Sequence, residues 1–217
     1  IAYVKLGQYE NETFVKRLND YTKVDVIKGN TLDVVLEQLK PYQTVIMGFH
    51  TNGKSAYSSY KFSETDLHWI QEIARKHDVV LNVFASPYSL LQLKSSVNIE
   101  AILVSYQNTP VFQDLSAQMI FGAMDIKGRL PVNISKEFSY GKGLDIADIK
   151  RLGYSIPEDV CLDSEKLNKI DSVANRVIKE KMAPGLQVLV AKEGKVIYRK
   201  NFGYYTYDNK KPVTDES

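Results

Sequence analysis

Short runs of hydrophobic residues alternate with helix-like segments through the first two thirds of the chain. Five runs predict β-strands, at residues 3–6, 24–27, 44–49, 79–84 and 101–104. The last three are nearly continuous in apolar residues, as expected of strands that helices cover on both faces. The runs therefore predict a mostly parallel sheet.

Three of the intervening segments have apolar residues at helical spacing, and they cover residues 31–40, 64–76 and 112–123. Ser63 and Asp66 have the spacing of an N-terminal cap for the second of these helices. The third has an apolar stripe made by Phe112, Leu115, Met119, Ile120 and Ala123. Strands that alternate with helices over short connections predict a three-layer α/β/α sandwich with a mostly parallel sheet.

The pattern changes after about residue 140. Residues 141–162 have no clear period and contain Gly141, Gly143, Gly153 and Pro157, so they are interpreted as a linker. An apolar stripe at helical spacing then runs from Leu167 to Met182, followed by two strand-like runs joined at Glu193-Gly194. We expect 1–140 to be an α/β domain and 163–217 to be the helix and hairpin of a truncated second domain.

Composition excludes several classes of protein. Over 217 residues, 44% are hydrophobic and 25% are charged, which suits a globular chain with a sizeable core. The net charge of +2 argues against a nucleic-acid partner, and no apolar run has membrane-spanning length. Cys161 is the single cysteine and the three histidines are dispersed, so we expect no disulfide, no metal site and no cofactor.

Several runs in the first domain resemble a known family. They are VFASPY (83–88), LVSYQNTP (103–110), FGA (121–123) and GRLPV (128–132). Together they are similar to the C-terminal α/β domain of glycoside hydrolase family 3, in its bacterial β-N-acetylhexosaminidase branch. The resemblance covers residues 1 to about 140 and is most specific from about Asp78.

This resemblance implies a retaining glycosidase that hydrolyses terminal amino-sugar bonds in glycans such as those of the cell wall. In the family an aspartate nucleophile lies on an N-terminal barrel, and in this branch a histidine on the same barrel is the acid/base. Both positions would precede Ile1. The resemblance therefore implies no catalytic residue in this chain and makes the barrel of the same polypeptide its partner.

The second domain carries a different resemblance. The runs APGL (183–186), VLV (188–190), GKV (194–196) and KPVT (211–214), with Gly203, are similar to the N-terminal part of serine β-lactamases and penicillin-binding proteins. Their S-x-x-K nucleophile motif would follow Ser217. The pairing of the two families implies a bacterial cell-wall enzyme in the periplasm or cell envelope. Because the chain begins with Ile1, we expect a piece of a longer polypeptide.

Open parallel sheets place ligands at the carboxyl ends of their strands, which suggests weak candidates for a site. The polar stretch after Phe49 contains His50, Asn52 and Lys54, while Tyr106 and Gln107 follow another predicted strand. These side chains could contact a substrate or the barrel. The favoured interpretation is a solvated loop or a domain interface.

The predicted C-terminal helix and hairpin raise a question of stability. A lone helix of this length and a lone hairpin are each only marginally stable in water, so the apolar stripe of residues 167–182 must be covered. We expect it to dock on the α/β domain or on a second copy of the chain, giving a homodimer through the helix and hairpin.

Two other functions were considered, of which the first remains open. The first is a non-catalytic flavodoxin-like module that binds a small molecule or a partner, because the same fold hosts many functions. No glycine-rich phosphate loop follows a predicted strand, which counts against nucleotide binding. The second is a serine hydrolase, which fails for these residues because no nucleophile motif is present in the lactamase-like part.

Overall fold

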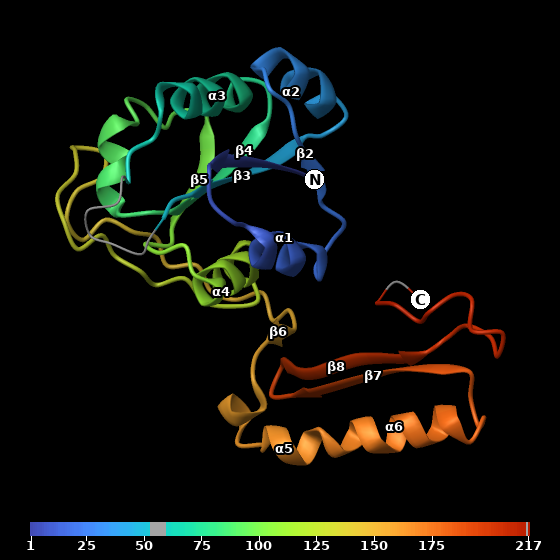
Figure 1. Cartoon of the computed structure of the whole chain (residues 1–217). Helices are drawn as coiled ribbons and strands as arrows, with labels where there is room; N and C mark the ends of the chain where they lie inside the picture. Colours follow the sequence, from blue (N-terminus) through green and yellow to red (C-terminus); the bar gives the residue numbers. More distant parts are fainter. Residues whose placement is uncertain (53–59, 216) are drawn as a thin grey trace. The chain divides into compact units, whose positions relative to one another are not determined.

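The computed structural model describes residues 1–52, 60–215 and 217, and it divides them into two compact units (Figure 1). The first unit is Ile1–Ile149 and the second is Lys150–Ser217. The boundary lies inside the range 141–162 that was predicted to be a linker. Each unit is described by itself.

In the described part of the first unit, five strands form a sheet that is parallel throughout. The strands are β1 (Ala2–Gly7), β2 (Asp25–Ile27), β3 (Thr44–His50), β4 (Asp78–Phe84) and β5 (Ile99–Val104), and their order is β2-β1-β3-β4-β5. In register, Met47 lies beside Val4 on one side and beside Leu81 on the other. The predicted parallel sheet is confirmed.

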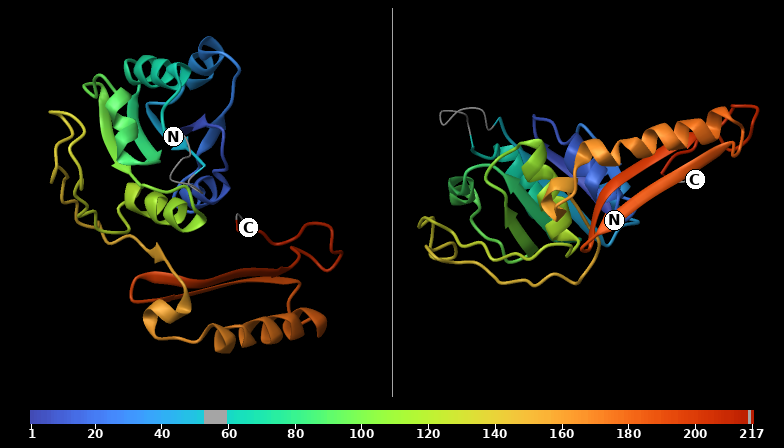
Figure 2. Two further views of the ribbon diagram at one scale, coloured as in Figure 1. Left: turned by 60° about the vertical axis from the view of Figure 1, so that its left-hand side comes forward. Right: turned by 90° about the horizontal axis from the view of Figure 1, so that it is seen from below.

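Helices cover both faces of this sheet, as Figures 1 and 2 show. The helices are α1 (Glu12–Asn19), α2 (Leu32–Leu39), α3 (Glu64–Ala74) and α4 (Pro110–Ile120), and a 3-10 helix, η1, spans Pro87–Gln92. The pair α2 and α3 lies on one face, and the pair α1 and α4 on the other. The three-layer sandwich is therefore confirmed, although α1 was not among the predicted helices.

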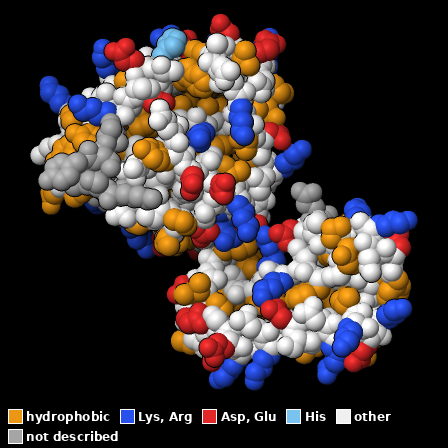
Figure 3. Space-filling model, viewed as in Figure 1, with side chains coloured by type: hydrophobic (Ala, Val, Ile, Leu, Met, Phe, Trp, Pro, Cys, Tyr) orange, Lys and Arg blue, Asp and Glu red, His pale blue; other side chains and the backbone are white. Residues whose placement is uncertain are grey.

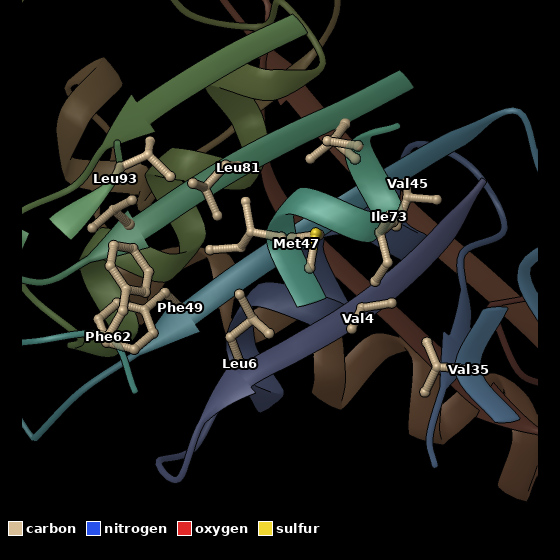
Figure 4. Close-up of a cluster of buried hydrophobic side chains, with 14 of the residues drawn as sticks. Val4, Leu6, Val35, Val45, Met47, Phe49, Phe62, Ile73, Leu81 and Leu93 are labelled. Carbon is tan, nitrogen blue, oxygen red and sulfur yellow. The ribbon is translucent and has the colours of Figure 1, made fainter. Parts of the chain in front are cut away.

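The core of the first unit explains the uninterrupted apolar runs. Side chains on one face of the strands pack with those of α2 and α3, as Figure 4 shows for Met47, Leu81 and Ile73. Those on the other face, including Tyr3 and Ile46, pack with Phe14 of α1. Each central strand is buried on both faces, so the sequence has no reason to alternate.

One predicted stripe is only partly confirmed: Ile120 packs against the core, but other residues form most of the buried face of α4. The buried side chains of α4 are Gln113, Ser116, Ala117 and Gln118, whereas Phe112 of the predicted stripe is 36% exposed. The buried polar groups are paired: the Ser116 hydroxyl donates to the Phe112 carbonyl at 2.6 Å, and Gln118 donates to Asp114 at 2.6 Å. Hydrogen bonds thus satisfy the polar part of a buried helix face that also contains the apolar Ala117.

The second unit contains a helical segment beside a small sheet. Its elements are β6 (Gly153–Tyr154), the 3-10 helix η2 (Pro157–Val160), α5 (Ser164–Leu167), α6 (Lys169–Lys179), β7 (Gly185–Lys192) and β8 (Lys195–Gly203). Among the described residues of this unit the strand order is β6-β8-β7. Glu193 and Gly194 both have positive φ, as a tight hairpin turn requires. The predicted hairpin is confirmed.

The apolar stripe of α6 lies over its own hairpin. Ile170, Val173 and Val177 line one side of a groove of about 350 Å³, with Leu186 and Val188 of β7 on the other side. The stripe therefore contacts the hairpin of its own unit. The sequence had predicted contact with the α/β domain or with a second copy of the chain instead. A homodimer through the helix and hairpin stays a prediction.

Candidate functional site

The candidate site is the edge of the first unit's sheet at which β1, β3, β4 and β5 end, here called the carboxyl edge. The order β2-β1-β3-β4-β5 has its topological switch point between β1 and β3, where open α/β sheets bind ligands. His50 ends β3, Asn52 follows it, and Tyr106 and Gln107 follow β5. Lys54, the remaining predicted site residue, lies outside the described residues.

His50 is buried, so its prediction as part of a solvated loop is wrong. Its exposed fraction is 0%, and its ring stacks on Phe84 with the centroids 4.5 Å apart. The Tyr3 hydroxyl lies 2.8 Å from Nε2, and the Asn108 side-chain oxygen lies 2.8 Å from Nδ1. Its position as the last residue of a strand covered on both faces explains the burial.

The neighbours of His50 select one form of its ring. The Asn108 amide nitrogen donates to the Glu10 carbonyl at 3.2 Å, and its oxygen accepts from Gln113 at 2.8 Å. That oxygen is thus an acceptor, and His50 Nδ1 must carry the proton. Nε2 is then an acceptor for the Tyr3 hydroxyl, so the whole set fits neutral His50.

Burial lowers the pKa of His50 to about 4, with the hydrogen bond to Asn108 opposing the shift and Lys5 adding to it. Burial also raises the pKa of Tyr3. Both groups are therefore uncharged at neutral pH. Tyr3, His50, Asn108 and Gln113 are called the His50 cluster below.

The His50 cluster ties two connections of the chain together. Gln113 in α4 donates to the Glu10 carbonyl at 2.9 Å and accepts from the Phe14 N–H at 3.1 Å. Glu10 lies between β1 and α1, while Asn108 lies between β5 and α4. One hydrogen-bonded set thus fixes the β1–α1 and β5–α4 connections to the end of β3.

A second buried set anchors the end of β5. The Asn82 amide of β4 donates to the Ser105 hydroxyl at 3.2 Å, and the hydroxyls of Ser105 and Ser116 lie 2.6 Å apart. Ser105 and Asn108, at the two ends of a four-residue stretch, are both held inward by side-chain hydrogen bonds. Tyr106 and Gln107 between them are directed to the surface.

Tyr106 sits in a constrained turn. Its φ is +61°, and the Gln107 N–H donates to the Ser105 carbonyl at 2.6 Å, which makes a γ-turn. The Tyr106 side chain is 39% exposed and Gln107 is exposed. Partial burial raises the pKa of the Tyr106 hydroxyl. A non-glycine residue held at positive φ is strained, and such strain is concentrated at functional sites.

The described residues at the carboxyl edge therefore divide into two groups. His50 is internal, whereas Asn52 is half-buried and Tyr106 and Gln107 are accessible. Tyr3, Asn108 and Gln113 were not predicted. A hydroxyl-bearing side chain in a mostly apolar strand could have pointed to Tyr3, but Gln113 is one of several polar residues of α4 and has no such signal.

Among the described residues, no group of three or more His, Cys, Asp or Glu is arranged to hold a metal ion. No helix in the same part of the chain has the length and apolar character needed to cross a membrane. Lys or Arg and Asp or Glu side chains are interspersed on the visible face of each unit (Figure 3).

Comparison with known proteins adds no further identification. No protein-family model matches the chain, and no curated protein and no solved structure matches it.

Proposed function

We propose that this chain is an accessory part of a glycoside hydrolase of the β-N-acetylhexosaminidase type, acting on terminal amino-sugar bonds of cell-wall glycans. The first unit corresponds to the C-terminal α/β domain of that enzyme, and the second unit to a β-lactamase-like module. The chemistry belongs to a barrel of the same polypeptide. The first unit borders that barrel or its substrate.

The observation that carries this proposal is the placement of the run LVSYQNTP. It contains the end of β5, the β5–α4 connection and the first residue of α4. Its Ser105 and Asn108 are hydrogen-bonded into the domain, so they hold Tyr106 and Gln107 outward at the edge where such sheets bind ligands. An aromatic ring beside an amide suits contact with a sugar ring and its hydroxyls.

The accessory role follows from the chemistry of retaining glycosidases. The reaction needs a nucleophile and an acid/base on opposite sides of the glycosidic bond, about 5 Å apart. Tyr106, Gln107 and Asn52 are not carboxylates, so they do not supply the pair of acidic groups of this reaction, although they can orient a substrate. We therefore expect this chain by itself not to hydrolyse a chromogenic β-N-acetylglucosaminide.

Sugar binding at the carboxyl edge can be measured on the chain as it is. We expect N,N′-diacetylchitobiose to shift the backbone amide signals of Asn52, Tyr106 and Gln107 in a nuclear magnetic resonance titration. Cellobiose, which lacks the N-acetyl groups, should shift them less. Tyr106→Ala should remove the effect. Tyr207→Ala, which alters a tyrosine of the second unit that is 56% exposed, should preserve it.

The outcomes separate the proposal from its alternatives. Shifts confined to other parts of the first unit, or equal shifts with both sugars, would argue against an amino-sugar subsite here. Turnover of the glycoside by the chain alone would contradict the accessory role. The reading frame around the chain gives a second test, because we expect a barrel with an aspartate nucleophile before Ile1 and S-x-x-K soon after Ser217.

A flavodoxin-like binding module is the second candidate, favoured by the strand order β2-β1-β3-β4-β5. The residues at the switch point disfavour the binding of a negatively charged phosphate group. Glu10 and Glu12 lie at the start of α1, and the Gly7 N–H already donates to the Asp66 carboxylate at 3.3 Å. Saturable binding of flavin mononucleotide would favour this candidate over the glycosidase.

A further inference from the structure

The connection that leads from the first unit to the second is exposed along its length. Residues 140–152 form the longest run of exposed residues in the described part of the chain. They contain no helix and no strand, and one isolated bridge, between Ile146 and Ile126, ties them to the preceding residues. Exposed, irregular stretches of this kind are the preferred sites of proteolytic cleavage in folded proteins.

The last three residues of this run lie between an anchor of the first unit and an anchor of the second. The Ile149 N–H donates to the Gly122 carbonyl at 2.9 Å within the first unit. The Gly153 N–H donates to the Gly194 carbonyl at 2.9 Å within the second unit. Residues 150–152 fall between these two hydrogen bonds, so a cut among them breaks neither anchor.

These residues begin with a basic pair, Lys150-Arg151, and both members are exposed. The chain has four other pairs of adjacent Lys or Arg residues, at 16–17, 75–76, 199–200 and 210–211. The first two lie within α1 and directly after α3, and the third lies within β8. The fourth belongs to a turn, in which the Tyr205 N–H donates to the Lys211 carbonyl at 2.9 Å. Lys150-Arg151 is therefore the pair that an endopeptidase reaches without opening a helix, a strand or that turn.

The backbone and side chain of Lys150 both suit cleavage. Its φ is +56°, a left-handed conformation that is unfavourable for a residue with a side chain. Endopeptidases bind their substrates as extended segments, so the change to the bound conformation relieves this strain. A Lys or Arg side chain before the cleaved bond fits an acidic specificity pocket.

A cut at this pair leaves the core of each unit complete. In the described part of the first unit, the apolar clusters extend no further along the chain than Phe138. In the second unit, β6 begins at Gly153 and pairs with β8, which also pairs with β7. The elements of both folds thus lie outside residues 150–152.

We propose that Lys150-Arg151 is a processing site, at which an endopeptidase with an acidic specificity pocket divides the chain into its two units. Water adds across the peptide bond, so Lys150 or Arg151 gains a carboxylate and the following residue gains an amino group. The inference is independent of the proposed glycosidase role, because it depends only on the connection between the units.

Limited proteolysis of the whole chain with trypsin, which cleaves after Lys and Arg, tests this site. Intact-mass spectrometry identifies each C-terminal fragment in the order in which it forms. We expect the fragments 151–217 and 152–217 to appear before any other, because cleavage elsewhere needs more structure to open. A first C-terminal fragment with any other start would overturn the proposal.

A synthetic peptide of residues 145–156 gives the rate of cleavage at the pair in the absence of a fold. We expect the whole chain to be cut at the pair at a rate within roughly tenfold of that of the peptide, since little structure has to open. A slower cut would show that the folded chain protects the pair, and it would contradict the processing site.

Two double variants identify the residues responsible. Lys150→Gln with Arg151→Gln should lower the total rate at which C-terminal fragments form by at least about tenfold. A smaller fall would overturn the proposal, because other basic residues of the connection, such as Lys142, would then be cut as readily. Lys210→Gln with Lys211→Gln is the matched control and should leave the rate unchanged.

The state of the products gives a further test. After the cut, the backbone amides of Met47 in the first unit and Val196 in the second should keep the hydrogen-exchange protection that they have in the uncut chain. Loss of protection at either amide would contradict a division into two folded units.

Discussion

At the scale of single residues, the carboxyl edge depends on His50 and Gly7, whose surroundings tolerate few other side chains. His50 accepts from Tyr3 and donates to Asn108, and the backbone of the same residue leaves no room beside Gly7. Gly7 has φ +73°, and a Cβ atom there would lie 2.3 Å from the His50 carbonyl oxygen. The end of β1 can therefore approach the end of β3 only as glycine.

Gly7→Ala should destabilise the first unit by about 2 kcal/mol or more, because a side chain adds left-handed strain and a clash with backbone. Urea unfolding followed by circular dichroism measures the loss. Gly128→Ala is the matched control, since a Cβ at Gly128 meets nothing within 4 Å. The control should change stability by less than about 0.5 kcal/mol. Equal effects in the two variants would show that the close approach at Gly7 is unimportant.

At the scale of elements, local sequence signals define some helix ends and leave others to packing. The predicted cap at the start of α3 is confirmed as a capping box, in which the Asp66 N–H donates to the Ser63 hydroxyl at 3.0 Å and the Ser63 N–H donates to the Asp66 carboxylate at 2.9 Å. Asp66 also accepts from the Gly7 N–H. Thr31 before α2 makes no side-chain cap hydrogen bond.

Ser63→Ala should cost about 1 kcal/mol of unfolding free energy, because it leaves an N–H of the first turn of α3 without its acceptor. Thr31→Ala removes a hydroxyl at the same position of α2, where no cap bond is lost, so its cost should be clearly smaller. Urea unfolding of both variants makes the comparison. A larger loss in Thr31→Ala would contradict the assignment of the caps.

At the scale of the whole molecule, the two units bury very different amounts of apolar side chain. The first has a sheet packed on both faces, with Val45, Met47 and Leu81 at 0% exposure. In the described part of the second unit, the buried hydrophobic residues are Val160, Ala174, Val196, Ile197 and Tyr198. A small core gives a marginally stable unit.

We therefore expect the second unit to unfold at a lower urea concentration than the first. Amide hydrogen exchange at increasing urea would measure this, with Val196 reporting on the second unit and Met47 on the first. Loss of protection at Val196 should come first. A single transition shared by both amides would show that the second unit gains stability from outside its own core.

The sequence determined the architecture of the first unit. Continuous apolar runs and helical stripes were enough to predict the parallel sheet and the three layers, because a strand buried on both faces leaves that pattern directly in the chain. The Ser63 cap and the Glu193-Gly194 turn could also be predicted from the sequence, since both depend on residues close together in the chain.

Only the tertiary structure decided the roles at the carboxyl edge. His50 lies 58 residues before Asn108, and its place in a polar stretch suggested a solvated loop, because the partners that bury it come from other elements. The same cause misplaced part of the stripe of α4, whose buried face contains the hydrogen-bonded Gln113, Ser116 and Gln118 beside the apolar Ala117. The spacing of hydrophobic residues indicates which side chains are buried by apolar contact, but it does not indicate which polar groups form hydrogen bonds with each other in the fold.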